Sequence, residues 1–313
     1  MRERNLRTRI ATGSFTLPVA AVATALLWIG SALTDEAAWT GLLLTGAVTY
    51  MLVELNNRNA LLRERSRMVS TVYLAFMAGS PFLHPWSPAM LPAAALAAAY
   101  FPLFAAYQSR RAAARVFNAA LLLSLGSLVY APLLLLLVGV FLSLGLQLRA
   151  LSGRTFMALI LGGAAPYWLF FGWAIWQHDL PWTLTALQAM FSLSPPDYAT
   201  LSLPELVIGG YVALLSLVAV IHFFRTAYND KIRTRMYFYT LILVEAILAV
   251  AIALQPQRAD VLLRLLMVNS APLVAHHLTL ARGRWANVWF AICLLGLAAV
   301  IVFNTAGFHA SHH

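Results

Sequence analysis

Long, uninterrupted runs of apolar residues constrain this chain more than any other feature of its sequence. They recur in blocks of roughly 18 to 23 residues, and an α-helix rising about 1.5 Å per residue needs about that many to cross a membrane. Runs such as APLLLLLVGV (131–140) are continuously apolar, whereas the strands of a membrane barrel alternate with a period of two. The sequence therefore predicts an all-α fold, a polytopic transmembrane helical bundle.

The overall composition supports the same class. Hydrophobic residues make up 61% of the 313 positions and charged residues only 10%, whereas a soluble domain carries about 25% charged residues. The formal net charge is +10, but the basic residues lie in short clusters between apolar runs and form no single basic face, so we expect no nucleic-acid partner. The lone cysteine, Cys293, excludes an internal disulfide and a cysteine-based metal site.

The apolar runs can be assigned to about eleven spans within one integral-membrane domain, residues 1–313. The run at 116–148 is too long for one span, and Gly126 and Pro132 divide it into a close hairpin that either crosses fully or is re-entrant. The expected spans are 10–33, 37–53, 68–83, 89–107, two within 116–148, 155–176, 204–224, 236–254, 261–280 and 285–303.

The distribution of basic residues orients these spans. With eleven crossings and a cytoplasmic N-terminus, every lysine and arginine except Arg258 and Arg264 falls in an inside segment, as the positive-inside bias requires. Misplacing any single span would scatter this distribution. We therefore expect the N-terminus in the cytoplasm and the C-terminus in the periplasm.

The longest loop, residues 177–203, contains no lysine or arginine and is external in this topology. Some of its apolar residues are spaced to form one face of a short helix lying in the membrane interface. They are Trp182, Leu187, Met190 and Phe191. Such a helix would be suited to cover the apolar tail of a lipid.

The spans at 236–254 and 261–280 carry the polar groups that are most out of place in a membrane. Ionisable groups at membrane depth are costly and mark a functional site by default. Folding this hairpin about its short QPQRAD turn brings Glu245 level with Asn269 and Ser270, close to mid-membrane. We expect these three residues to form a polar cluster there.

Arg264 lies about one helical turn below the outer surface, four residues after Asp260. It either binds an anionic group or pairs with Asp260 while its guanidinium reaches outward. At about 100° per residue, Asn269 and His276 share a stripe from which Arg264 is roughly 140° away. These groups can line one narrow pocket only if Pro272 kinks or rotates the helix.

His276 and His277 lie near the inner end of their span, where we expect a structural hydrogen bond. Adjacent histidines on a helix point about 100° apart and make a poor chelate, so no metal site is expected. The sequence also contains no phosphate-binding loop, zinc-hydrolase motif or serine-hydrolase motif. We therefore expect no cofactor.

Two further polar groups lie at the ends of spans. The stretch ELNNR, which includes Arg58, ends the second span, and it is either a capped helix end or a cytoplasmic site for an anionic headgroup. Asp35 and Glu36 are the first acidic residues outside. This acidic pair is similar to the motif in the first external loop of multi-pass polyprenyl-sugar glycosyltransferases; otherwise it simply follows the charge bias.

Three stretches resemble a poorly characterised family of bacterial polytopic inner-membrane proteins. They are ELNNRNALLRERSR, RVFNAALLLSLGSLVYAPLLLLLVGVFLSL and RALSGRTFMALILGGAAPYW, in this order within 54–168. The resemblance implies an inner-membrane location and no settled activity. The hairpin around 127–132 is also loosely similar to the EpsG and O-antigen polymerase type, which acts on lipid-linked sugars outside the membrane through external-loop arginines. Here the external arginines are Arg258 and Arg264.

These features lead to three functional hypotheses. The first is an inner-membrane protein of bacterial envelope biogenesis that handles a lipid-linked anionic glycan, as a metal-independent transferase or polymerase if it is an enzyme. The second is a non-enzymatic scaffold or subunit that binds an envelope protein partner, and the third is a transporter or flippase with a water path at Glu245. For the first, the candidate residues are Arg264 for the pyrophosphate, Asn269, Ser270 and Arg58 for further substrate contacts, and Glu245, Asp35 or Glu36 as the base.

Overall fold

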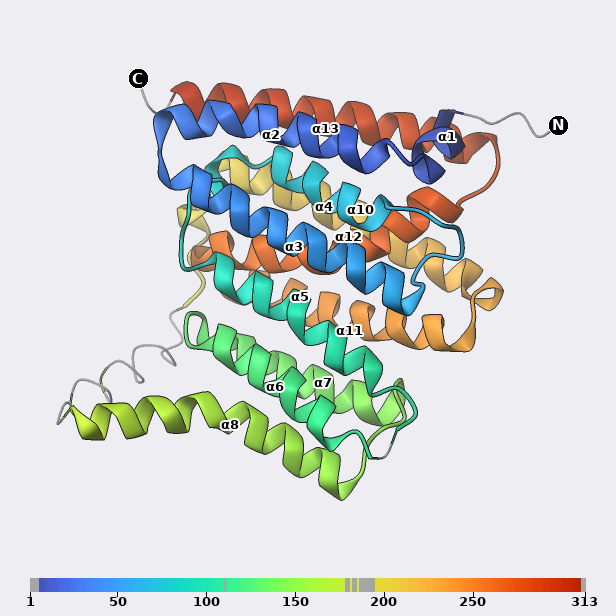
Figure 1. Cartoon of the computed structure of the whole chain (residues 1–313). Coiled ribbons are helices and arrows are strands. Elements are labelled where there is room, and N and C mark those ends of the chain that lie inside the picture. Colours follow the sequence, from blue (N-terminus) through green and yellow to red (C-terminus); the bar gives the residue numbers. More distant parts are fainter. Residues whose placement is uncertain (1–5, 110, 178–180, 182–184, 186–194, 311–313) are drawn as a thin grey trace. The chain divides into compact units, whose positions relative to one another are not determined.

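The computed structural model describes residues 6–109, 111–177, 181, 185 and 195–310, and every regular element in these ranges is a helix (Figure 1). The expected all-α fold is therefore confirmed for this part of the chain. The interfacial helix predicted from Trp182, Leu187, Met190 and Phe191 lies outside the described residues.

Seven of the described helices are long and apolar enough to cross a membrane. Their length and composition indicate a multi-pass membrane protein, as expected from the apolar runs. These helices are α2 (Thr16–Thr34), α3 (Ala37–Asn59), α8 (Gly153–Trp176), α10 (Leu203–Thr226), α11 (Ile232–Leu254), α12 (Ala259–Leu280) and α13 (Arg284–Ala310).

Four other apolar helices are shorter: α4 (Met68–Ala78), α5 (Met90–Ala105), α6 (Ala113–Ser127) and α7 (Leu135–Leu146). With 11 residues, α4 covers only about 16 Å, roughly half of the hydrocarbon core. Nearly all of its residues are buried. A helix surrounded by protein does not need to match the thickness of the lipid, because neighbouring helices replace lipid around it.

Two expected spans differ from the helices observed. The span expected at 10–33 is divided into α1 (Leu6–Thr12) and α2, because the chain turns at Gly13. The span expected at 68–83 ends as an α-helix at Ala78 and continues as the 3₁₀ turn η1 (Pro81–Leu83). Proline lacks the amide hydrogen that would continue the helix. The hairpin expected within 116–148 is present, with α6 and α7 joined through the 3₁₀ turn η2 (Ala131–Leu134).

The helices form two compact units. The first consists of Met1–Ser87, Leu201–Arg235 and Leu266–His313, and the second of Pro88–Thr200 and Met236–Leu265. Neither unit is a continuous segment, since α11 and α12 each contribute to both. α12 is also the most buried of the seven long helices, with 94% of its apolar window inside the molecule.

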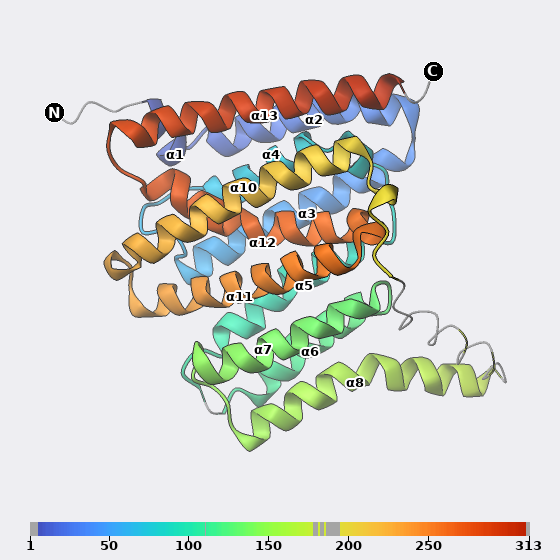
Figure 2. The same cartoon turned by 180° about the vertical axis from the view of Figure 1, so that it is seen from behind.

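In the first unit, α4 packs against α2 and α3, and α13 packs against α10 (Figure 2). A buried histidine joins α2 to the end of α4. The ring of His84 stacks on Trp28 with centroids 3.7 Å apart, its Nε2 lies 3.0 Å from the Met77 carbonyl oxygen, and its Nδ1 lies 2.8 Å from Ser31 Oγ. Because a carbonyl only accepts, Nε2 carries a proton and donates to it. These contacts give the histidine a structural role.

In the second unit, α6 lies between α5 and α8 (Figure 1). Small residues let these backbones approach closely, as is common for helices in membranes. Gly126 of α6 faces Pro92 and Ala95 of α5, and Gly162 of α8 faces Phe117 and Ala120 of α6. A methyl group added at Gly162 would lie 2.4 Å from the Phe117 carbonyl oxygen, so this position has no room for a side chain.

The turns of the second unit are joined to one another at two opposite ends. Between α6 and α7, the Tyr130 hydroxyl donates to Gln255 Oε1 in the turn between α11 and α12, at 2.7 Å. At the other end, the Gln108 amide after α5 donates to the Leu148 carbonyl after α7, at 2.8 Å. Successive turns along the chain therefore lie alternately at the two opposite ends of this unit.

The first unit shows the same pattern. The Trp86 amide, after η1, donates to the Ala37 carbonyl at the start of α3, at 3.0 Å. Toward the opposite end of these helices, the Ser66 hydroxyl before α4 donates to the Ala11 carbonyl in α1. Within each unit, consecutive helices that run in opposite directions account for the contacts between its turns.

Candidate functional site

The three residues expected at mid-membrane are all buried. Glu245 lies on the part of α11 in the second unit and is 9% exposed, and Tyr100 of α5 is close enough to interact electrostatically with its carboxylate. Asn269 and Ser270 lie on the part of α12 that belongs to the first unit. Their expected depth at mid-membrane stays a prediction. A single cluster of Glu245 with Asn269 and Ser270 stays a prediction.

Arg264 is only 5% exposed, although it lies near the start of α12. Its Nη1 donates to the backbone carbonyl of Asp260 at 3.2 Å. The guanidinium is therefore turned toward its own helix and packed inside the protein. Whether Arg264 binds an anionic group or pairs with Asp260 stays a prediction.

Asp35 and Glu36 are exposed in the short turn between α2 and α3. The Asp35 carboxylate accepts the Ala37 amide at 2.8 Å, which satisfies a donor at the start of α3. Both residues belong to the first unit and Glu245 to the second. The Asp35 carboxylate thus has a local structural role at a helix start.

Arg58 is at the exposed end of α3, with its side chain 65% exposed and its Nε 2.6 Å from the Glu54 carboxylate. An exposed pair of this kind contributes about 0 to 1 kcal/mol. Asn56 holds the following loop, because its Nδ2 donates to the Ser66 carbonyl at 2.9 Å and its Oδ1 accepts the Leu62 amide at 3.3 Å. These contacts favour the interpretation of this stretch as a capped helix end.

A buried ionic group that the sequence did not reveal lies in the first unit. The Asp230 carboxylate, after α10, lies 2.9 Å from His276 Nε2 on α12 and 3.1 Å from Arg63 Nε in the loop after α3. Arg63 also donates to the Asn229 carbonyl at 3.2 Å. Both Asp230 and His276 are buried. The structural hydrogen bond expected for the histidine pair is confirmed at His276, and it joins three segments at one end of the unit.

His277 lies beside this group on α12. Its ring meets that of His222 from α10 edge to face, with centroids 4.5 Å apart, and Trp289 of α13 lies 6.5 Å away. His277 is 8% exposed, and neither ring nitrogen has a hydrogen-bond partner among the described residues. Among all the residues that the structure describes, no three histidine, cysteine or carboxylate side chains are arranged to hold a metal ion. The ring packs mainly as an aromatic group.

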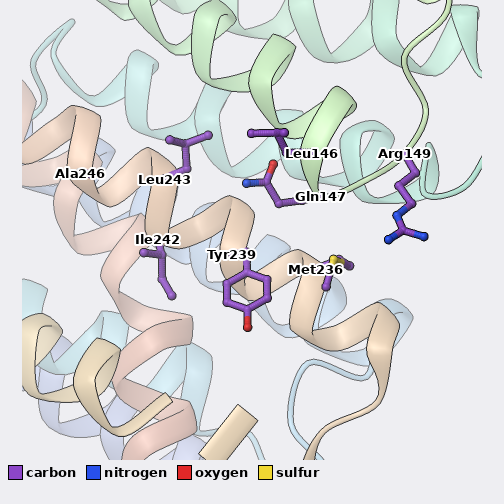
Figure 3. Close-up of a pocket in the computed structure, with 8 residues that line it drawn as sticks. All are labelled: Leu146, Gln147, Arg149, Met236, Tyr239, Ile242, Leu243 and Ala246. Atoms are coloured by element: carbon purple, nitrogen blue, oxygen red, sulfur yellow. The ribbon is translucent and has the colours of Figure 1, made fainter. Parts of the chain in front are cut away.

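A groove in the second unit combines a fixed cation with an apolar wall (Figure 3). It has a volume of about 550 Å³ and lies between the end of α7 and one face of α11. Arg149 lies at the end near Met236, and Ala246 lies at the opposite end. The complete lining is Leu146, Gln147, Arg149, Met236, Tyr239, Ile242, Leu243 and Ala246.

The loop after α7 fixes the position of Arg149. The Leu148 amide donates to the Ser143 carbonyl at 2.7 Å, and the Ala150 amide donates to the Leu144 carbonyl at 2.9 Å. These bonds close the end of α7 and leave Arg149 between them in the left-handed conformation, with φ of 49°. The exposed side chain of Arg149 thus starts from a backbone that its neighbours hold on both sides.

Three polar side chains line this groove. Besides Arg149 they include the Tyr239 hydroxyl and the Gln147 amide, whose buried Oε1 has no hydrogen-bond partner among the described residues. Leu243 and Ala246 supply an apolar surface farther along α11. The combination is suited to an amphiphile with an anionic head and an apolar chain.

Comparison of the chain with protein-family models, with curated proteins and with solved structures gives no match. The resemblance to bacterial inner-membrane proteins, and that to lipid-linked glycan polymerases, therefore stay predictions from the sequence.

Proposed function

We propose that the protein is an eleven-span bacterial inner-membrane protein with its N-terminus in the cytoplasm and its C-terminus in the periplasm. Seven long and four shorter apolar helices correspond to the spans of this topology. The bond between Tyr130 and Gln255 joins two turns that it assigns to the outside, and the bond between Gln108 and Leu148 joins two turns that it assigns to the inside. The placement of the basic residues supports the same orientation.

Within the cell envelope, the protein binds a lipid-linked anionic substrate in the groove between α7 and α11. The observation that carries this proposal is Arg149, held by its loop at one end of an otherwise largely apolar groove. In the proposed topology this end faces the cytoplasm, at the depth of lipid headgroups. The substrate phosphate binds there, and the lipid chain follows α11 toward Ala246.

The chemistry of the lining fits this substrate class. A guanidinium offers paired N–H donors to phosphate oxygens, and it is more easily desolvated than an ammonium group. The Gln147 side chain, which also lines the groove, adds a neutral hydrogen-bonding group. From Met236 to Ala246, α11 extends about 15 Å, which provides an apolar track for an acyl or prenyl chain.

A non-enzymatic role receives support from the three acids considered as bases. Asp35 caps the start of α3, Glu36 is exposed beside it, and Glu245 is buried on a helix of the other unit. We therefore favour a binding or scaffold function over a transferase. The burial of Glu245 likewise gives no support to a water path at this residue, which the transporter hypothesis requires.

Binding can be tested with the purified protein and lipids added in detergent, by native mass spectrometry. The probes are a polyprenyl phosphate and phosphatidylglycerol, with a neutral diacylglycerol for comparison. Replacing a charge-assisted bond to phosphate removes about 1.5 to 3 kcal/mol, so Arg149→Gln should lower retention of both anionic lipids about 10- to 100-fold.

Arg284→Gln provides the matched control, because Arg284 is an exposed arginine at the start of α13 and does not line this groove. It should retain the anionic lipids as the wild type does. Equal losses in both variants, or unchanged retention in Arg149→Gln, would refute the assignment of the groove. If polyprenyl phosphate and phosphatidylglycerol are retained equally, the groove recognises a phosphate-bearing lipid in general.

A further inference from the structure

A second groove lies in the first unit and shares no residue with the first. It runs between the start of α10, the second half of α13 and the turn η1, and it has a volume of about 1180 Å³. Its wall is mainly apolar, with Phe82, Leu203, Pro204, Val302 and Phe303 among its residues. In the proposed topology this part of both helices lies near the periplasmic surface of the inner membrane. The groove therefore opens where lipid headgroups meet acyl chains.

The charged side chain in the lining of this groove is an acid, Glu205. One of its carboxylate oxygens accepts from the Ser202 amide and the Ser202 hydroxyl, both at 2.8 Å, in the capping box that begins α10. The hydroxyl is thereby used as a donor within the protein. The half-buried Glu205 side chain presents its carboxylate in the lining of the groove.

Asn304 adds a second acceptor. It is 1% exposed, and its Nδ2 donates to the Gly79 carbonyl at 2.7 Å. Because that carbonyl only accepts, the amide nitrogen must face Gly79 and the amide oxygen must face the other way. Among the described residues, Asn304 Oδ1 has no hydrogen-bond partner. A buried acceptor without a donor is unfavourable, and a ligand that brings N–H or O–H groups would satisfy it.

We propose that this groove binds a phospholipid with a primary ammonium head, such as an ethanolamine lipid. The ammonium group supplies the positive charge that Glu205 complements and three N–H donors for acceptors such as Asn304 Oδ1. The apolar wall along α13 holds an acyl chain. A phosphate-headed lipid without the amine meets a carboxylate here and is disfavoured.

The same acidic character extends over the outer turns of this unit. Asp35 and Glu36 occupy the turn between α2 and α3, and all basic residues of the first unit lie in segments that the proposed topology assigns to the inside. No lysine or arginine on this side of the unit therefore competes for Glu205.

The test uses the whole protein and three lipids with identical acyl chains. Phosphatidylethanolamine supplies charge and N–H donors, phosphatidylcholine supplies a positive group without N–H donors, and phosphatidylglycerol supplies neither. Native mass spectrometry should show the ethanolamine lipid retained about fivefold or more above the other two. Equal retention of the ethanolamine and choline lipids would overturn the proposal.

Glu205→Gln removes the charge while its side-chain oxygen can still accept the Ser202 bonds, so α10 keeps its cap. This variant should lose the ethanolamine preference and keep the wild-type elution profile. Glu36→Gln removes an exposed outer acid that does not line the groove, and it should keep the preference. A preference that survives Glu205→Gln, or that disappears equally in both variants, contradicts the assignment. Arg149→Gln leaves this preference unchanged, so the two lipid proposals fail independently.

Discussion

The contact between α6 and α8 offers a sharp test of the packing in the second unit. At Gly162, an added methyl carbon would lie 2.4 Å from the Phe117 carbonyl oxygen and 2.9 Å from the Ala120 methyl group. The first distance is about 1 Å short of the 3.4 Å at which ordinary contact begins. The obstructing oxygen belongs to the backbone of α6, so rotating a side chain cannot relieve the clash, and the two helices must separate.

The magnitude follows from two opposing effects. Gly→Ala in a helix gains about 1 kcal/mol of intrinsic stability, whereas overpacking a close contact costs about 1 to 3 kcal/mol. Gly172, on the same helix, has nothing within 4 Å of the position of an added methyl group. We therefore expect Gly172→Ala to stabilise the protein by up to about 1 kcal/mol, and Gly162→Ala to be less stable than Gly172→Ala by about 1 to 3 kcal/mol.

Gly163 makes the series graded. A methyl group there would lie 2.8 Å from a terminal methyl of Leu137, which is the far end of a flexible side chain. Gly163→Ala should therefore fall between the other two variants. Unfolding in mixed micelles of dodecyl maltoside and sodium dodecyl sulfate, followed by tryptophan fluorescence, gives the three free energies. If Gly162→Ala is as stable as Gly172→Ala, the close approach of α6 and α8 is refuted.

Three further predictions concern the ion pairs and turns. Asp230→Ala removes a buried carboxylate that holds an arginine and a histidine, and it should lower the unfolding free energy by about 3 kcal/mol. Glu54→Ala, at an exposed pair, should lower it by less than about 1 kcal/mol. Equal effects of the two variants in the same unfolding assay would refute the buried network. Burial raises the pKa of Tyr130 to about 12, so Tyr130→Phe should cost about 1 kcal/mol near neutral pH. Because the folded pKa lies above the unfolded value, this difference should shrink as the pH rises from 10 toward 12; a constant difference would contradict it. The topology can be tested with single cysteines in a background without the native cysteine. Gln257→Cys should react with a membrane-impermeant maleimide in intact spheroplasts, and Tyr228→Cys should react only after lysis. The reverse result would overturn the proposed topology.

Helix positions could be predicted well from this sequence because they depend on a local property. The spans expected at 236–254 and 261–280 end at the same residues as α11 and α12, and each begins within a few residues of the observed start. Local composition fixes where a chain can leave a membrane. Local composition does not show that neighbouring helices surround α4. Because they do, α4 can be shorter than the expected span at 68–83.

The buried ionic group shows what the sequence could not provide. Asp230 follows α10 within the basic stretch RTAYNDKIRTR, where an acid is expected to face solvent. Its partner His276 lies 46 positions away, and Arg63 lies on a third segment. Only the packing of α10 and α12 brings the three together. From the sequence alone, Arg149 indicates only the orientation of the chain. Its groove depends on how α7 approaches α11, which the sequence does not show.

In the proposed lipid sites, one lining charge also bears on membrane orientation. Arg149 lies among segments that the positive-inside bias assigns to the cytoplasm, and Glu205 lies in a unit whose outer segments, in the proposed topology, contain no lysine or arginine. Arg149 would therefore both bind a headgroup and contribute to orientation, whereas acids such as Glu205 contribute little to orientation. Because Arg149 orients the chain together with many other basic residues, replacing it should change lipid retention and leave the topology intact. Separate measurements of lipid retention and cysteine accessibility on Arg149→Gln would distinguish a role in binding from a role in orientation alone.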